Sequence, residues 1–184
     1  MNQVGLKKFL VLMALALVAI FIQGSLLRFA LPSFFVPNLL LVIVVFLGFY
    51  EVTPAGASIV FLLGLEADLC SGVLLGPSAA AFAATFGILA SFSSRLFVES
   101  SIAIAIGVFG AALVSNVIYL SLLYEFSDAV RHSFLAIAND ALVTAIVAPF
   151  FFPLLKRLLL PRRERPMPRA HMRAKHKIMR RRDA

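Results

Sequence analysis

Four long stretches of this chain contain no charged side chain: residues 9–27, 29–50, 69–94 and 100–124. A helix of about 20 apolar residues is long enough to cross the hydrocarbon core of a bilayer, which is roughly 30 Å thick. A soluble domain carries about 25% charged residues, whereas this chain has 14% charged and 61% hydrophobic residues. The sequence therefore predicts an all-α integral membrane protein.

Glycines, prolines and charged residues divide the apolar sequence into six expected transmembrane helices. Their expected ranges are 9–27, 34–50, 54–75, 77–94, 101–124 and 134–155. Only Gly76 and Pro77 separate the third helix from the fourth, so a count of five spans stays open there. Residues 1–160 form the predicted helical domain. Residues 161–184 form a basic tail that is expected to be disordered, because it is rich in charge and proline.

Basic residues are distributed unevenly between the two sides of this predicted bundle. With a cytoplasmic N-terminus, fifteen of the 17 Lys and Arg residues lie inside, and only Arg28 and Arg131 lie outside. Basic loops stay on the cytoplasmic side, so both termini are expected there. The tail either fixes this topology alone or binds anionic lipid head groups or an acidic partner. It has no aromatic residue for stacking on bases, which argues against nucleic-acid binding.

Small residues recur at four-residue spacing in the third, fourth and fifth expected helices. This spacing keeps them on one helix face, and small residues allow membrane helices to approach closely. A compact bundle is therefore predicted. The positions expected to pack closely are Gly64, Gly72, Gly76, Ala83, Gly87, Gly107 and Ala111.

Polar side chains inside the apolar spans form the candidate functional site, which consists of Asp68, Asn116, Asn139 and Asp140. Ionisable groups in a bilayer are costly and are functional candidates by default. At about 1.5 Å per residue, Asp68, Asn116 and Asp140 lie roughly 10–12 Å below the external surface. We expect this layer to be either a hydrogen-bonded clamp between helices or a cavity for a ligand or a partner's helix.

Other residues limit the chemistry that this layer can perform. Glu66 and Asp68 are two residues apart and point about 200° away from each other, so they do not share a proton. Cys70 is expected to be a small buried hydrophobe. The sequence has no phosphate-binding loop, zinc helix or nucleophilic serine motif. A non-enzymatic protein without catalytic residues, cofactor or metal site is therefore expected.

Three segments carry a resemblance to a known family: VPNLLLV at 36–42, GLEADLCSGVLLG at 64–76 and IANDALVTAIVAPFFFPLLKRLL at 137–159. In these segments the chain resembles the bacterial rod shape-determining protein MreD family. The central segment matches the family's pattern of glycine, a short apolar stretch, Asp-Leu, a small pair and Leu-Gly. Glu66 stands where the family is usually apolar, and the basic tail is longer than is general in the family.

The resemblance implies a non-enzymatic scaffold in the bacterial inner membrane that associates with an MreC-like protein. Through that partner it would act with MreB-like filaments and with the RodA and penicillin-binding-protein synthase in peptidoglycan insertion. The family is also similar in fold to the S components of energy-coupling-factor transporters. A vitamin-binding transporter subunit is therefore the alternative, although Ala14, Ala16 and Ala19 do not form the alanine face with which S components dock.

Overall fold

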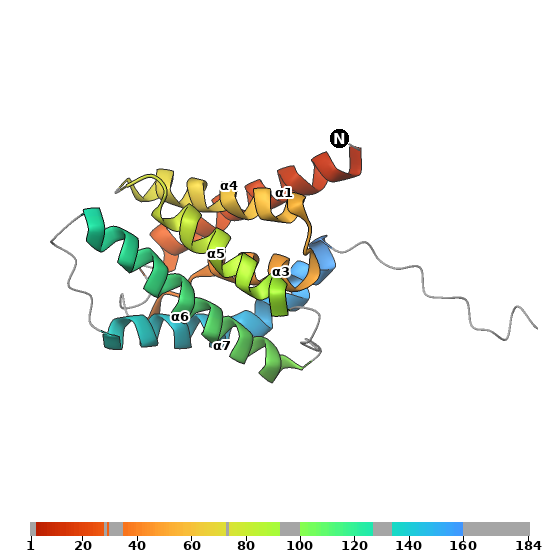
Figure 1. The fold of residues 1–184 in the computed structure, drawn as a ribbon. Helices are drawn as coiled ribbons and strands as arrows, with labels where there is room; N and C mark the ends of the chain where they lie inside the picture. The colour runs from red at the N-terminus through yellow and green to blue at the C-terminus, as the bar shows by residue number, and fades with distance from the viewer. Residues whose placement is uncertain are drawn as a thin grey trace, which may run out of the picture.

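A computed structural model describes residues 3–27, 29, 35–72, 74–92, 100–126 and 134–159. The predicted basic tail, residues 161–184, lies outside these ranges. All regular structure within them is helical (Figure 1). The elements are α1 (Gln3–Phe21), the π-helical continuation η1 (Ile22–Leu27), α3 (Leu39–Tyr50), α4 (Pro54–Ser71), α5 (Pro77–Phe92), α6 (Ser101–Phe126) and α7 (Phe134–Leu159).

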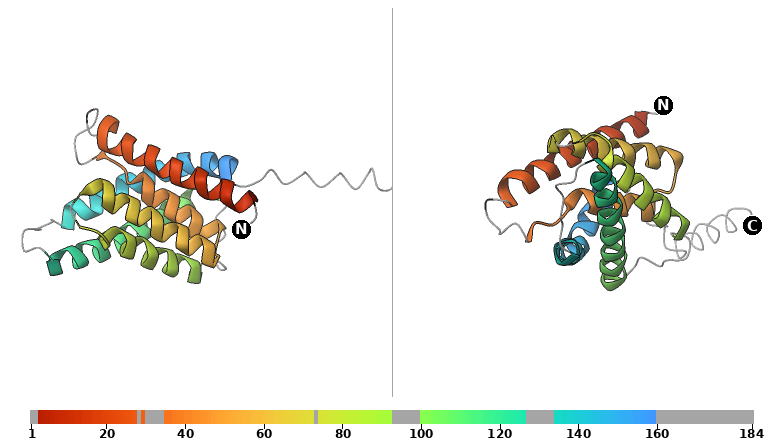
Figure 2. Two further views of the ribbon diagram at one scale, coloured as in Figure 1. Left: turned by 90° about the horizontal axis from the view of Figure 1, so that it is seen from above. Right: turned by 60° about the vertical axis from the view of Figure 1, so that its left-hand side comes forward.

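The helices run alternately from one end of the bundle to the other (Figures 1 and 2). The start of α1 and the end of α7 lie at the same end in both figures. The α4–α5 turn, the end of α6 and the start of α7 lie at the opposite end, which we call the turn end. This order matches the six expected segments, and α4 and α5 are two separate helices rather than one.

Three of these helices are long and apolar enough to cross a membrane: Pro54–Ser71, Ser101–Leu123 and Leu135–Leu159. Three shorter apolar helices accompany them, namely Phe9–Ser25, Leu39–Tyr50 and Pro77–Phe92. Leucine, isoleucine and phenylalanine side chains remain exposed on α1, α4, α6 and α7, which suits a lipid environment better than water. The structure is thus consistent with a membrane protein.

Helix α3 forms the centre of the bundle. It is apolar on all sides, as is typical of a buried helix, and every residue from Leu39 to Gly48 is buried. The prediction that this helix begins at residue 34 was wrong, because Val36 to Asn38 are not helical. With 12 residues at 1.5 Å each, α3 is only about 18 Å long. Neighbouring helices rather than lipid therefore surround it.

An aromatic cluster fixes the C-terminal end of α3. The Phe46 and Phe152 rings meet edge to face with their centroids 5.6 Å apart, and Phe46 also packs on Tyr50 at 4.9 Å. The Lys156 ammonium lies 4.9 Å from the centroid of the Tyr50 ring, within the range of a cation–π contact. This cluster joins α3 to the last turns of α7.

Some of the small residues that were predicted to pack closely do so in the structure. Gly64 packs against Ala79, Gly107 against the Phe49 ring, and Ala111 is buried. Ala83 is half-buried.

Close packing was wrongly predicted at Gly72, Gly76 and Gly87, where an added Cβ would meet nothing within 4 Å. Gly72 and Gly76 are turn residues, and Gly87 lies on the exposed face of α5. Helix α5 instead uses its larger side chains, Phe82, Phe86 and Leu89, to pack into the core.

Candidate functional site

Asp68 is 2% exposed, and its carboxylate binds the backbone where α5 begins. Oδ2 accepts hydrogen bonds from the N–H groups of Gly76 at 2.8 Å and Ala79 at 3.3 Å. Oδ1 accepts from the N–H of Ser78 at 3.0 Å. The first N–H groups of a helix have no partner within the helix, and a nearby negative charge is favourable there. Asp68 therefore caps α5 from the preceding helix.

The two turn glycines explain why a distant residue supplies this cap. Gly76 occupies the N-cap position of α5, since its carbonyl accepts the first helical hydrogen bond, from the N–H of Ala80 at 2.8 Å. A serine or aspartate at an N-cap accepts from its own helix, but Gly76 has φ 117°, a region that favours glycine. Gly72 ends α4 with φ 66°. The turn therefore needs glycines, and Asp68 replaces the missing cap side chain.

Gly64 brings the two helices of this hairpin close enough for the cap to form. A Cβ atom on Gly64 would lie 2.3 Å from Ala79 Cα and 2.9 Å from the Ser78 carbonyl carbon. Helix α4 thus contacts the backbone of α5 directly, one turn before Asp68. Together, Gly64, Asp68, Gly72 and Gly76 make up the Asp68 turn.

The remaining residues of the predicted polar layer lie between α6 and α7. Asn116 Nδ2 donates to Asp140 Oδ2 at 2.8 Å, and both side chains are partly buried. Asn139 lies next to Asp140 on α7 and also makes a polar interaction. The layer therefore consists of two separate clamps, because Asp68 bonds to the α4–α5 turn whereas Asn116 bonds to Asp140.

A third set of hydrogen bonds holds the non-helical entry to α3. Gln23 Nε2 donates to the carbonyl of Pro37 at 2.8 Å, and the N–H of Asn38 donates to the buried Thr144 hydroxyl at 2.9 Å. Asn38 Oδ1 accepts from the N–H of Leu41 at 3.0 Å, which caps α3. Irregular backbone at membrane depth occurs only inside protein or beside a cavity. Here, η1 and α7 supply the required partners.

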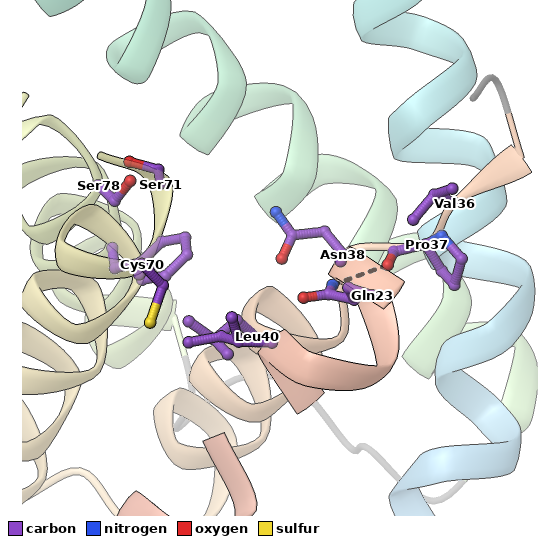
Figure 3. Close-up of a pocket in the computed structure, with 12 residues that line it drawn as sticks. Gln23, Val36, Pro37, Asn38, Leu40, Cys70, Ser71 and Ser78 are labelled. Carbon is purple, nitrogen blue, oxygen red and sulfur yellow. Dashed lines mark hydrogen bonds between the residues drawn. The ribbon is translucent and has the colours of Figure 1, made fainter. Parts of the chain in front are cut away.

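An open cavity of about 440 Å³ lies between η1, the entry to α3, the end of α4 and the start of α5 (Figure 3). Its polar lining comes from Gln23, Asn38, Cys70, Ser71 and Ser78. In the figure, the Gln23 and Asn38 side chains extend from one side of the cavity toward Cys70, Ser71 and Ser78 on the other. The cavity is at the turn end of the bundle and directly beside the Asp68 turn.

Two residues of α4 differ from simple expectation. Cys70 was expected to be buried, but it is exposed and lines the cavity. Glu66 Oε2 is buried and has no hydrogen-bond partner among the described residues. As expected from their spacing, Glu66 does not join Asp68 at the start of α5.

Sequence reasoning missed the part that Ser71, Ser78 and Thr144 play at these sites. Single hydroxyl residues are common in membrane helices, and nothing in the sequence marks Thr144 as the partner of Asn38, 106 positions away. Gln23 and Asn38 were the available signals, because amide side chains in apolar spans need partners.

The described residues contain no group of three or more His, Cys, Asp or Glu side chains placed to hold a metal ion. The site offers amides, hydroxyls and carboxylates engaged in hydrogen bonds, an arrangement suited to holding helices together and to binding neutral molecules. Comparison of the chain with known family models, characterised proteins and solved structures gives no match.

Proposed function

We propose that this chain is a non-enzymatic scaffold of the bacterial rod-shape machinery, with an MreC-like membrane protein as its partner. The Asp68 turn is the observation that carries the proposal, because it lies within the segment that most resembles the MreD family. Asp68, Gly72 and Gly76 each have a specific structural need there. A turn with these specific needs is expected to support the fold that the resemblance implies, and the proposed partnership follows from the resemblance.

The proposal places all six helices across the inner membrane, with both termini in the cytoplasm. Helix α1 continues directly into η1, so the first membrane-crossing segment is longer than α1 alone. Helix α3 is shorter than the bilayer but is enclosed by protein, so its ends need not reach lipid head groups. The turn end then faces the exterior, and the similarity to the S-component fold stays an expectation from the resemblance.

Co-expression with the MreC-like partner tests this function. The scaffold proposal predicts that the two full-length proteins purify as one complex in mild detergent, whereas an unrelated single-span coiled-coil protein does not co-purify. Depletion of the chain is expected to round rod-shaped cells, with recovery on re-expression. The proposal is wrong if the two proteins migrate separately and depleted cells remain rod-shaped.

The cavity favours a second candidate function, the substrate-binding subunit of a small-molecule transporter. Its volume of about 440 Å³ falls within the range of about 300–1,000 Å³ typical of ligand pockets. This candidate predicts thermal stabilisation by a vitamin and co-purification with an ATPase module. A vitamin screen without any stabilisation, together with a stable MreC-like complex, would decide for the scaffold.

A further inference from the structure

The cavity beside the Asp68 turn has both polar and apolar walls, and the lining residues that the structure describes include no charged side chain. A charged ligand in this open site would lose part of its hydration without meeting an opposite charge among these residues, which is costly. On α4, Asp68 has both oxygens bonded to backbone N–H groups, and neither Asp68 nor Glu66 is among the described lining residues. The described lining residues therefore favour an uncharged ligand over an ion.

Two amide side chains on one wall are held in fixed orientations. The Nε2 of Gln23 donates to the Pro37 carbonyl, so Gln23 offers its Oε1 as an acceptor. The Oδ1 of Asn38 accepts from the Leu41 N–H, so Asn38 offers its Nδ2 as a donor. Figure 3 shows both amides extending toward the opposite wall. A hydroxyl group, which both donates and accepts, matches this pair.

Apolar side chains complete the cavity. Ile20, Leu40 and Phe82 line it together with Val36 and Ala67. Its volume of about 440 Å³ lies within the range of about 300–1,000 Å³ typical of ligand pockets. This is enough space for a small polar head and part of an apolar chain.

We propose that the cavity binds an uncharged, hydroxyl-bearing amphiphile, of which a monoacylglycerol is the simplest example. Its hydroxyl groups lie between Gln23, Asn38 and Ser78, and its apolar part lies against Leu40 and Phe82. The site rests on the cavity alone and holds under either function proposed above. A ligand of this chemistry reaches the site either from the membrane, as a neutral lipid, or from outside, as a water-soluble polyol.

Cys70 provides the probe, because it lines the cavity, is exposed and is the single cysteine of the chain. The full chain is placed in phosphatidylcholine nanodiscs, and the rate of alkylation by N-ethylmaleimide is followed by intact-protein mass spectrometry. The ligands are 1-monooctanoylglycerol, octanoate, octylammonium and glycerol, of which the first three have the same chain length. The neutral ester is expected to slow alkylation at least fivefold, and the two charged amphiphiles less than twofold.

Protection by 1-monooctanoylglycerol without protection by glycerol assigns the membrane as the source of the ligand. Protection by glycerol as well assigns a water-soluble polyol. Protection by neither ligand, or equal protection by octanoate, overturns the proposal. Loss of the MreC-like complex is a separate readout, so failure of the scaffold function and failure of this site are distinguishable.

Variants then locate the bound molecule. Ala67→Leu fills the cavity and Gln23→Leu removes the acceptor, so both are expected to lose protection by the neutral ester. Ser91→Ala is the matched control, because the exposed Ser91 hydroxyl bonds only to its own helix, at Gly87 O. Folding of each variant is checked by far-UV circular dichroism. If one of the two cavity variants does not fold, the other still tests the site. Protection that persists at wild-type level in both folded cavity variants contradicts binding in this cavity.

Discussion

Replacing Gly64 by alanine tests the close packing of α4 against α5. The new Cβ would lie 2.3 Å from Ala79 Cα and 2.7 Å from Ala79 N, whereas carbon atoms pack comfortably at about 3.5–4.0 Å. To reach 3.5 Å from 2.3 Å, the helices must separate by about 1.2 Å. The clashing atoms belong to the backbone, so rotation of a side chain cannot relieve the contact.

The energetic effect has three parts. Overpacking costs about 1–3 kcal/mol. The separation also breaks the hydrogen bond from Ala79 N–H to Asp68, which is already 3.3 Å long, and a bond to a charged group contributes about 1.5–3 kcal/mol. Alanine regains about 0.5–1 kcal/mol of helix propensity over glycine. The net expectation is a destabilisation of about 2–5 kcal/mol.

Gly87→Ala is the matched control, since it makes the same change within α5 where the added Cβ meets nothing within 4 Å. It is expected to keep or slightly raise stability, by about 0.5–1 kcal/mol. Both variants are unfolded by titration with sodium dodecyl sulfate in mixed micelles and followed by far-UV circular dichroism. If Gly64→Ala is as stable as Gly87→Ala, the close approach of α4 and α5 is refuted.

Three other changes test the separate clamps in the same unfolding assay. Asp68→Leu leaves the α5 cap N–H groups without an acceptor and is expected to cost at least about 3 kcal/mol, with Asp68→Asn milder; equal stability of Asp68→Leu and wild type would contradict the cap. Asn116→Leu is expected to destabilise the protein by about 1–3 kcal/mol, because Asp140 loses its hydrogen-bond donor. If the costs of Asn116→Leu and Asp140→Leu simply add in the double variant, the two side chains do not interact and this explanation is wrong. Thr144→Val is expected to cost about 1–2 kcal/mol because the Asn38 N–H loses its acceptor; an unchanged midpoint would mean that this N–H finds another partner.

The helices themselves were predictable because their signal is local. Charge-free runs and the breaks at Pro54 and Pro77 gave boundaries close to those of α4 and α5. The all-apolar sequence of α3 is typical of a helix buried on every side, and the structure has it at the centre of the bundle. The start of α3 was predicted too early in the sequence, because Asn38 is the N-cap residue at which the helix begins.

The Asp68 turn was only partly readable from the sequence. The four-residue spacing of Gly64, Asp68, Gly72 and Gly76 suggested a continuous packing face on one helix. Helix α4 ends at Ser71, so Gly72 and Gly76 do not lie on that face. Positive φ at a glycine leaves no mark in the sequence that distinguishes it from a close helix contact. The cap depends on a fold-back of the chain, and such a contact is not encoded by periodicity.

The cavity depended still more on tertiary structure. Cys70 appeared to belong to a buried apolar run, yet the register of α4 is set by Gly64 and Asp68, which face α5. This register turns Cys70 toward the cavity. The sequence does not specify which faces of η1 and α4 leave space between them.

Site-specific labelling in intact cells measures most directly whether the turn end faces the exterior and the termini face the cytoplasm. A membrane-impermeant maleimide is applied to cells expressing the wild-type chain, whose single cysteine is Cys70, and to a Cys70→Ala, Ser100→Cys variant. Ser100 lies just before α6, at the end of the bundle that holds the start of α1 and the end of α7. Labelling of Cys70 in intact cells, with labelling at position 100 only after permeabilisation, is the result predicted here. The reverse pattern, or equal labelling of both positions before permeabilisation, contradicts the account.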